Sequence, residues 1–245
     1  MSATPSAKPH TRAARTRAWA VHVFTLCGLP LAFLAAGALA KGDARMFFAA
    51  MWATAVIDSV DGTLARRARV KEVVPQFDGA LLDNIIDFLT FVFLPVLALP
   101  ALGLLPGEWL WWAIIPLMAS GYQFCQAKAK TDETFIGFPS YWNVVVIYLY
   151  VLDSPPWFTV VLLVLFGLLV FVPTHYLYPS RTRWLRPITI ALGAVWGAAL
   201  IAMCIAPDSG WAEQLGWASL YFPVYYFVMS FVLDRRVRSG AYQLE

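Results

Sequence analysis

The chain alternates between long apolar runs and short polar stretches. Most of the apolar runs are close to the ~20 residues that a helix needs to cross the hydrocarbon core of a membrane. Proline- and glycine-containing breaks, such as Pro106 with Gly107 and Pro155 with Pro156, separate the runs. No two-residue period and no internal repeat is visible. The pattern predicts an all-α, polytopic transmembrane helical bundle of about eight helices, over residues 18–40, 45–66, 78–99, 109–127, 139–152, 157–176, 187–206 and 215–233.

The start of the chain differs from this pattern. Residues 1–17 are small or polar and include Lys8, Arg12, Arg15 and Arg17. They predict a tail followed by a short basic amphipathic segment on the membrane surface, and they leave residues 18–245 as one transmembrane domain. A cleavable signal peptide is less favoured, because the first apolar run is longer than the 7–15 residues of a signal core.

Composition and charge support an integral membrane protein. The 245 residues are 60% hydrophobic and only 13% charged, with a mean hydropathy of +0.65, whereas soluble domains are about 25% charged. With eight helices, both termini lie on one side, and sixteen of the 18 basic residues then fall on that side. The positive-inside rule makes this side cytoplasmic. The net charge of +3 is small, the three cysteines and three histidines are scattered, and we expect neither a zinc site nor a nucleic-acid partner.

Four aspartates interrupt the second and third apolar segments. An Asp near the bilayer centre costs about 2.5–3.5 kcal/mol, so each needs compensation. Asp58 and Asp61 share one helix face, as do Asp83 and Asp87. Two consecutive spanning helices run antiparallel, and the acids of both lie roughly 8–13 Å below the cytoplasmic ends of their helices. The spacing predicts that the four carboxylates converge at two levels near the cytoplasmic surface.

Converging carboxylates repel one another unless cations lie among them. Ligands that are all oxygen suit Mg²⁺ or Mn²⁺, and two such ions form the usual clamp for displacement at phosphorus. The sequence therefore predicts two divalent ions held by the four aspartates. A polar helix–helix seam paired to nearby arginines explains one or two of the acids. A divalent-cation transporter is a second alternative, but its acids should occur in both halves of the bilayer.

The residues that carry this site form a long motif with fixed spacing. Asp58, Asp61, Gly62, Ala65 and Arg66 are followed by Gly79, Asp83 and Asp87. This pattern resembles the signature of the CDP-alcohol phosphotransferases, and the resemblance covers about 30 residues. Two features depart from the usual pattern, namely eight helices instead of six and a longer gap of twelve residues between Arg66 and Gly79. Both are similar to the bacterial members that use choline.

The resemblance implies both a reaction and a set of roles. A phosphatidyl group passes from CDP-diacylglycerol, a membrane lipid, to choline, and CMP is released. Asp58, Asp61, Asp83 and Asp87 are then metal ligands, with Asp87 also the catalytic base. The nucleotide lipid contacts Asp58 and Asp61 together with Gly62, Ala65, Arg66 and Gly79. The resemblance also implies a homodimer in the bacterial cytoplasmic (inner) membrane, with the active site on the cytoplasmic side.

The acceptor is less well determined than the reaction. Serine, glycerol phosphate and inositol phosphate remain alternatives, and Lys128, Lys130, Arg181 and Arg183 are available for a phosphorylated acceptor. A trimethylammonium group is bound by aromatic faces, each contributing about 0.5–2 kcal/mol. The stretch TDETFIGFPSYWN at 131–143 therefore predicts a choline pocket formed by Tyr122, Asp132, Glu133, Tyr141 and Trp142. Aromatic residues also gather at membrane interfaces without any ligand.

Overall fold

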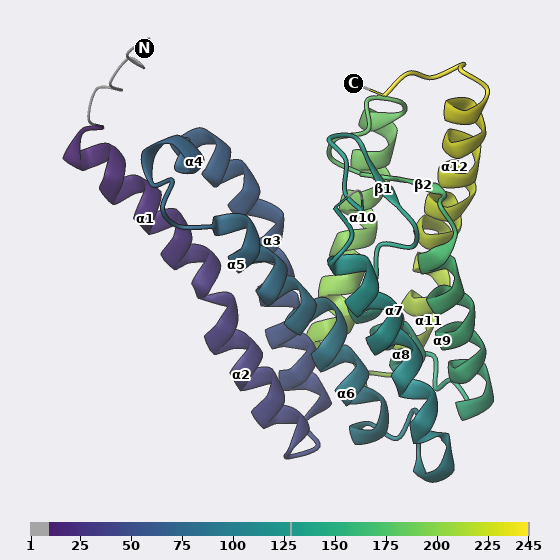
Figure 1. The fold of residues 1–245 in the computed structure, drawn as a ribbon. Helices are drawn as coiled ribbons and strands as arrows, with labels where there is room; N and C mark the ends of the chain where they lie inside the picture. Colours follow the sequence, from purple (N-terminus) through teal and green to yellow (C-terminus); the bar gives the residue numbers. More distant parts are fainter. Residues whose placement is uncertain (1–9, 128, 245) are drawn as a thin grey trace.

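The protein is an all-α bundle, as the hydrophobic pattern predicts (Figure 1). The computed structural model describes residues 10–127 and 129–244. Residues 1–9 of the predicted tail, including Lys8, and also Lys128 lie outside the described residues. The first half of the chain forms α1 (Arg12–Leu26), α2 (Gly28–Leu39), α3 (Ala44–Ala68), α4 (Val70–Val73), α5 (Gly79–Asp87), η1 (Phe88–Phe93) and α6 (Leu94–Ala101).

The second half is also helical, apart from two short strands. It forms η2 (Gly107–Ala113), α7 (Ile114–Phe124), β1 (Thr134–Ile136), α8 (Trp142–Val151), α9 (Pro156–Phe171), β2 (His175–Leu177), α10 (Arg186–Ile205), α11 (Ala212–Ser219) and α12 (Tyr221–Arg238). In Figure 1 the elements before residue 102 lie on one side of the bundle and α7, α9 and α12 on the other. Contacts of α10 with α3, and of α7 and α8 with η1, join the two sides.

Each predicted apolar segment contains a helix, but the sixth, 157–176, was predicted too long, because α9 ends at Phe171 and the chain continues into β2. Within the described residues, four helical stretches are long and apolar enough to cross a membrane: Arg12–Leu39, Gly79–Ala101, Arg186–Ile205 and Ala212–Arg238. The helix α3 has 25 residues, and its charged residues distinguish it from these four. The helices α8 and α9 are apolar but shorter. The predicted N-terminal surface segment is continuous with the first span, because α1 already begins at Arg12.

Polar residues begin the helices that carry the acids. The Asp43 side chain accepts a hydrogen bond from the Met46 amide at 2.8 Å and caps α3. The Asp78 side chain accepts from the amides of Ala80 and Leu81 at 3.1 and 3.0 Å and caps α5. Such caps satisfy amides that have no partner within the helix. The two caps fix where α3 and α5 begin. They therefore also fix the direction in which each aspartate points around its helix axis.

A π-helical segment, η1, follows directly after Asp87. Pro95 lies at the start of α6. A proline ring clashes with the carbonyl of the residue four positions earlier and donates no hydrogen bond. A widened π turn before it accommodates this clash while the helix continues. The third apolar segment therefore stays one continuous span, with Asp83 and Asp87 on its α-helical part.

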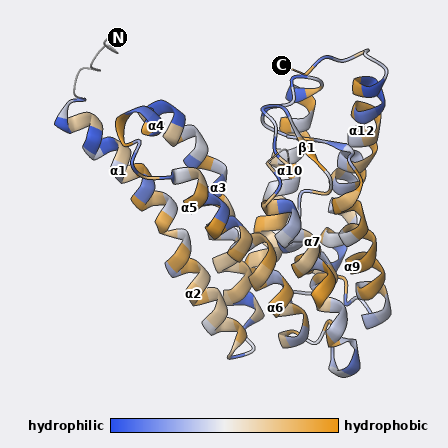
Figure 2. Ribbon diagram, viewed as in Figure 1, coloured by the Kyte–Doolittle hydropathy of each residue, from blue (hydrophilic) through white to orange (hydrophobic). Residues whose placement is uncertain are grey.

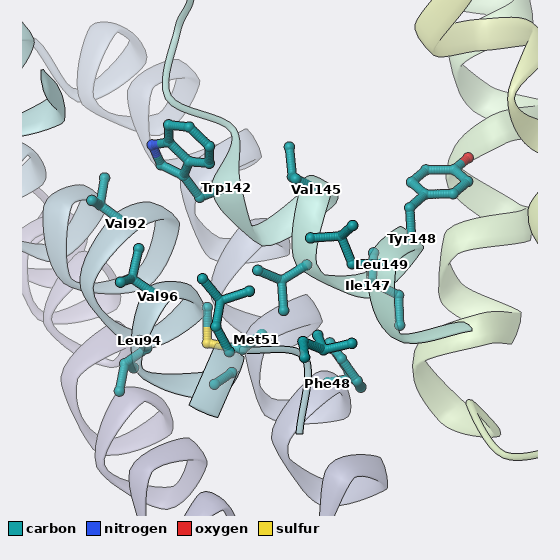
Figure 3. Packing of buried hydrophobic residues seen from close by; sticks show 14 of the residues in the cluster. Phe48, Met51, Val92, Leu94, Val96, Trp142, Val145, Ile147, Tyr148 and Leu149 are labelled. Atoms are coloured by element: carbon teal, nitrogen blue, oxygen red, sulfur yellow. The ribbon is translucent and has the colours of Figure 1, made fainter. Parts of the chain in front are cut away.

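The hydrophobic core joins the two sides of the bundle. Val92 and Val96 of the third span pack with residues of α3 and α8, and Figure 3 shows Trp142 in this cluster. Trp142 is completely buried, and its indole N–H donates to the Ser120 hydroxyl at 2.7 Å. Figure 2 shows hydrophobic residues along the helices and hydrophilic ones near the start of α1, around α4 and at the end of α12. These three regions lie at one end of the bundle.

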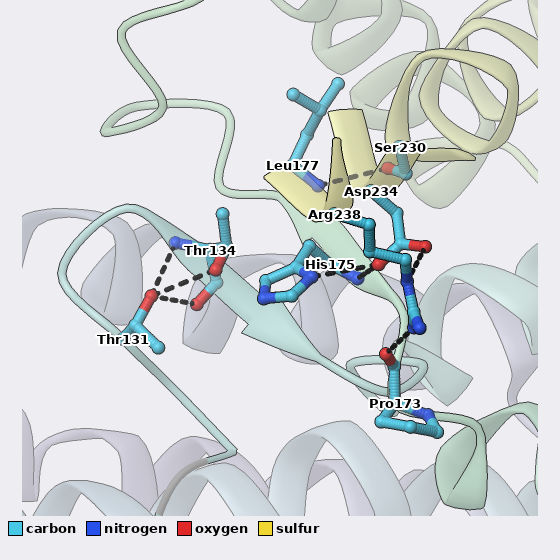
Figure 4. A network of polar contacts seen from close by, with 8 residues as sticks. All are labelled: Thr131, Thr134, Pro173, His175, Leu177, Ser230, Asp234 and Arg238. Atoms are coloured by element: carbon cyan, nitrogen blue, oxygen red, sulfur yellow. Dashed lines mark hydrogen bonds and ion pairs between the residues drawn. The ribbon is translucent and has the colours of Figure 1, made fainter. Parts of the chain in front are cut away.

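The strands β1 and β2 pair antiparallel at that same end of the bundle, with Phe135 opposite Tyr176. Figure 4 shows how side chains fix them. Asp234 of α12 accepts from the His175 amide at 3.0 Å and contacts the His175 ring at 2.9 Å. Arg238 bridges Asp234 at 2.7 Å and the Pro173 carbonyl at 2.7 Å. This small sheet, absent from the predicted architecture, brings the segments on either side of it to the same end of the bundle.

Candidate active site

Three of the four intramembrane aspartates come together between α3 and α5. Asp58, Asp83 and Asp87 each offer a carboxylate oxygen, and these oxygens all lie within 4.8 Å of one another. Each of the three side chains is partly buried. Helical spacing places Asp83 and Asp87 on one face of α5, and that face meets Asp58. We call these three residues the acid triad.

Asp61 lies beside the acid triad with a different partner. It is buried, at 6% exposure, and its carboxylate accepts a hydrogen bond from the Thr25 hydroxyl of α1 at 3.0 Å. It also interacts electrostatically with Asp83 and Asp58. The fourth acid is therefore held by the first helix, while the other three face one another.

The acid triad fits a divalent cation. Its ligand atoms are all carboxylate oxygens, which Mg²⁺ and Mn²⁺ prefer. Three carboxylates this close together repel unless they are protonated or share a cation. The donor set and its spacing therefore suit a hard divalent ion, while the second ion and the fourth ligand of the predicted site stay predictions.

Gly62 and Arg66 lie in the last two turns of α3. Arg66 is exposed, and its guanidinium donates to the Thr63 hydroxyl at 3.0 Å. A Cβ at Gly62 would meet only the Arg66 guanidinium, at 3.4 Å. Ala65 is partly buried against the small cluster formed by Val70, Val73 and neighbours. Gly62 and Arg66 thus border accessible space, whereas Ala65 packs against the turn that follows α3.

Gly79 begins α5 in close contact with α1. A Cβ at this position would lie 2.6 Å from Cε1 of His22. The His22 ring is 3% exposed and packs against Phe77, with ring centroids 4.5 Å apart, and against Trp19. The absence of a side chain at Gly79 therefore lets α1 approach the start of the helix that carries two of the acids.

One member of the acid triad, Asp58, lines a large apolar cavity. Its volume is about 870 Å³, and Asp58 lines it together with Tyr141 and Tyr226. It extends along α8 and α12 to Trp157 and Trp217. From Asn143 to Leu152, two residues that line the cavity, α8 rises roughly 14 Å. The lining thus combines one carboxylate of the acid triad with a long apolar surface.

Comparison with known proteins accounts for this combination. The family model for CDP-alcohol phosphatidyltransferase matches residues 16–137, which include all four acids. The chain is 38% identical to a phosphatidylcholine synthase of Pseudomonas aeruginosa over 74% of this chain and 77% of that protein. Phosphatidylcholine synthases of Legionella pneumophila (37% identity, over 89% and 90%) and Rhizobium meliloti (36% identity, over 75% and 77%) are similarly related. The chain belongs to the CDP-alcohol phosphatidyltransferase family.

Membership of the CDP-alcohol phosphatidyltransferases confirms the resemblance read from the motif, and it makes the chain a membrane-bound transferase. Family membership alone does not identify the residues that bind the acceptor. Of the five residues predicted for a choline pocket, Tyr141 lines the cavity and interacts electrostatically with Asp58 and Asp87. Its neighbour Trp142 is in the core, because α8 begins there and successive residues of a helix point about 100° apart.

The other three predicted residues lie elsewhere. Tyr122 is 49% exposed and packs against Phe171 of α9. Asp132 is exposed. Glu133 is buried and fully engaged: Arg183 pairs with its Oε1 at 2.6 Å, and the Tyr242 hydroxyl donates to its Oε2 at 2.7 Å. The structure thus brings only one of the five to the acids.

Aromatic residues from distant segments surround Tyr141 instead. Its ring lies 6.3 Å from those of Tyr226 and Phe91 and 6.2 Å from that of Phe135, centroid to centroid. The Tyr226 hydroxyl is buried without a hydrogen-bond partner among the described residues. Sequence reasoning did not single out Tyr226, because it lies 85 positions away on another helix, and nothing in its local sequence separates it from a lipid-facing tyrosine.

Proposed function

We propose that this CDP-alcohol phosphatidyltransferase transfers the phosphatidyl group of CDP-diacylglycerol to choline, giving phosphatidylcholine and CMP. The observation that carries the proposal is an acid triad with one member, Asp58, in the lining of a long apolar cavity, in a chain whose relatives are named phosphatidylcholine synthases. An amphiphilic substrate needs both parts, one for its diphosphate and one for its acyl chains.

The reaction is a direct displacement at phosphorus. The choline oxygen forms a bond to the phosphorus that carries diacylglycerol, and the bond from that phosphorus to the bridging oxygen of CMP breaks. The hydroxyl proton passes to the Asp87 carboxylate, which serves as the base, and CMP leaves with the bridging oxygen. Asp87 suits this role because it lies deepest in its helix among the acids of α5 and belongs to the acid triad.

Two divalent ions, Mn²⁺ or Mg²⁺, would be held by Asp58, Asp61, Asp83 and Asp87. When bound they supply charge stabilisation to the diphosphate oxygens and the leaving group. Arg66, exposed near the end of α3, would donate two hydrogen bonds to the diphosphate. Gly62, Ala65 and Gly79 then lie on the cytidine side. The hydrogen bond from Thr25 holds Asp61 in one orientation, so that this carboxylate is positioned before the substrate arrives.

The acceptor site forms around Tyr141. Quaternary ammonium groups bind to aromatic faces, and Tyr141 is the aromatic residue that combines a cavity position with electrostatic contact to Asp58 and Asp87. Tyr226 adds a second face at 6.3 Å. We therefore assign choline to the space bordered by these two rings. Trp142 and Glu133 instead support the pocket from outside, since one is in the core and the other is paired.

The orientation follows from charge. The basic residues at the end of the bundle that contains β1, α4 and the end of α12 face the cytoplasm of a bacterial cell. The active site then opens to cytoplasmic choline, while the apolar cavity lies along α8 and α12. A homodimer, expected from the family, is part of the same proposal.

The test is CMP release from CDP-diacylglycerol with a panel of acceptors: choline, serine, glycerol phosphate and inositol phosphate. Turnover with choline and phosphatidylcholine as the lipid product are expected. Turnover with serine or a phosphorylated acceptor in place of choline would refute the choline assignment and keep the transfer of a phosphatidyl group. No CMP release with any acceptor would refute both.

Variants sharpen the acceptor assignment. Tyr141→Ala should raise the KM for choline by about 2- to 30-fold, the loss of one aromatic face, and leave the KM for CDP-diacylglycerol nearly unchanged. Tyr122→Ala is the matched control, because this tyrosine packs on α9 away from the cavity. An unchanged choline KM in Tyr141→Ala would move the choline site elsewhere.

A further inference from the structure

Arginines lie where the start of α10 meets the end of α12, at one end of the bundle (Figure 1). Near this end a hydrogen bond between the Thr189 and Tyr225 hydroxyls, 2.7 Å long, joins the two helices. Beyond it, the Cζ atom of Arg236 lies 4.9 Å from the centre of the Trp184 ring, and Trp184 is two residues before α10. We call Arg186, Arg235 and Arg236 the arginine cluster.

No acidic side chain of the described residues neutralises the arginine cluster. Asp234 is the one acid within α12, and β2 and Arg238 take up its carboxylate. It accepts from the His175 amide at 3.0 Å and pairs with Arg238 at 2.7 Å (Figure 4). Among residues 10–127 and 129–244, no ion pair or hydrogen bond engages a guanidinium of the cluster. All three side chains are exposed, so their N–H groups are available to an outside anion.

The lipid-facing surface of α12 leads directly to the cluster. Val224, Val228 and Phe231 are 61%, 49% and 44% exposed, and their intervals of four and three residues put them on one helix face. This helix belongs to a stretch long and apolar enough to cross a membrane, so the exposed face contacts lipid tails. Arg235 continues the same face four positions after Phe231. Its guanidinium therefore reaches the level of the lipid headgroups, as basic side chains at the ends of spanning helices do.

Trp184 holds one arginine of the cluster in place. Its ring is partly buried against the hydrophobic core, and Arg236 lies over it. A guanidinium that lies over an aromatic ring offers its flat face to the ring, and its N–H groups project from the edge. This edge matches two oxygens of a phosphate group. Arg236 is therefore positioned to bind a phosphate before any ligand arrives.

We propose that the arginine cluster binds the phosphate of an anionic phospholipid. The orientation alone predicts basic residues at this end of the bundle. Three further features distinguish the cluster: it joins two spanning helices, an aromatic ring holds one of its members, and a lipid-facing stripe ends at another. That stripe offers the acyl chains of the same lipid a surface beside the cluster, which a soluble phosphate would not use. Basic pockets between spanning helices typically bind anionic headgroups.

The proposed lipid site is distinct from the candidate active site. None of the three arginines lines the cavity that contains Asp58. Its preference also separates the lipids of the proposed reaction, because CDP-diacylglycerol is anionic and phosphatidylcholine is zwitterionic. A cluster that prefers anionic headgroups would therefore keep the class of the substrate, but not the product, beside the enzyme. Only this consequence rests on the proposed function.

The experiment measures the binding of phosphatidylglycerol and of phosphatidylcholine with the same acyl chains. The full-length protein is titrated with each lipid in detergent, and bound lipid is counted by native mass spectrometry. The wild type should bind phosphatidylglycerol more tightly. Each basic residue contributes about fivefold to binding an anionic lipid surface. The Arg235→Gln, Arg236→Gln double variant should therefore bind phosphatidylglycerol about thirtyfold more weakly and phosphatidylcholine as the wild type does.

The matched control is the Arg67→Gln, Lys71→Gln double variant, which removes two exposed charges at the same end of the bundle. It should bind both lipids as the wild type does. A second variant on the other helix, Arg186→Gln, should weaken phosphatidylglycerol about fivefold. It tests the cluster even if the double variant fails to fold.

Several results would overturn the proposal. They are equal binding of the two lipids by the wild type, wild-type phosphatidylglycerol affinity in the cluster variants, or an equal loss in the control variant. Glycerol phosphate, which carries a phosphate without acyl chains, should not displace phosphatidylglycerol; displacement at equal concentration would assign the cluster to a soluble phosphate instead. The assay needs no turnover, so failure of the proposed reaction would leave this result unaffected.

Discussion

Replacing Gly79 by alanine tests whether this glycine serves helix packing. The added methyl would lie 2.6 Å from Cε1 and 3.1 Å from Nδ1 of His22. Carbon atoms in good contact are about 3.5–4.0 Å apart, so one partner must move by about 1 Å. The His22 ring is 3% exposed and wedged against Phe77 and Trp19, which leaves it little room.

The expected cost follows from this geometry. Overpacking of a tight site costs about 1–3 kcal/mol, and the better helix propensity of alanine returns at most about 1 kcal/mol. For a chain of this length the thermal midpoint of Gly79→Ala should fall by roughly 2–8 °C. The assay is thermal unfolding of the purified protein in detergent, followed by circular dichroism. Gly62→Ala is the control, because its new methyl meets only the mobile tip of Arg66 at 3.4 Å, and its midpoint should not fall.

A double variant identifies the partner. If His22 is the obstacle, His22→Ala combined with Gly79→Ala should be less destabilised than the sum of the single variants, by about 1 kcal/mol or more. A midpoint for Gly79→Ala equal to or above wild type, or strict additivity in the double variant, would refute the packing argument. The only role left for Gly79 would then be the predicted one, beside the cytidine.

Three further outcomes are expected. Thorough chelation should abolish CMP release and added Mn²⁺ or Mg²⁺ should restore it, because the proposed ligands are all hard oxygens; full activity in the chelated enzyme would contradict the metal site. Glu133→Gln should lower the thermal midpoint by roughly 2–4 °C, for a loss of about 1 kcal/mol, without raising the choline KM. The exposed Asp132→Asn should change neither the midpoint nor the choline KM. A raised choline KM in Glu133→Gln would return Glu133 to the acceptor pocket. Single cysteines introduced at Arg69 and Ser209 in a cysteine-free variant should react with an impermeant thiol reagent on intact cells only at Ser209, and labelling at Arg69 would reverse the orientation.

The pattern of hydrophobic and polar residues was sufficient to predict the all-α architecture and the helix faces on which the four aspartates lie. Hydrophobic runs of spanning length determine an all-α bundle, because a backbone in lipid must satisfy its hydrogen bonds within each segment. The intervals of three and four residues place Asp83 with Asp87 on one helix face, and Asp58 with Asp61 on another. Antiparallel neighbouring helices then bring the two pairs to similar depth. The family signature could be read from the same residues, since its spacing is local.

The tertiary structure decided what each of these faces meets. Asp61 lies on the predicted face beside the acid triad, and the tertiary structure adds Thr25 of α1, whose hydroxyl donates to its carboxylate. Tyr141 and Trp142 are adjacent in sequence, but the start of α8 sends one to the cavity and the other to the core. Lys130 lies beside the ring of Tyr178 because β1 pairs with β2, a strand from a distant segment of the chain. Periodicity fixes which side chains share a face, whereas the partner of that face depends on packing between segments far apart in the chain, which no local pattern encodes.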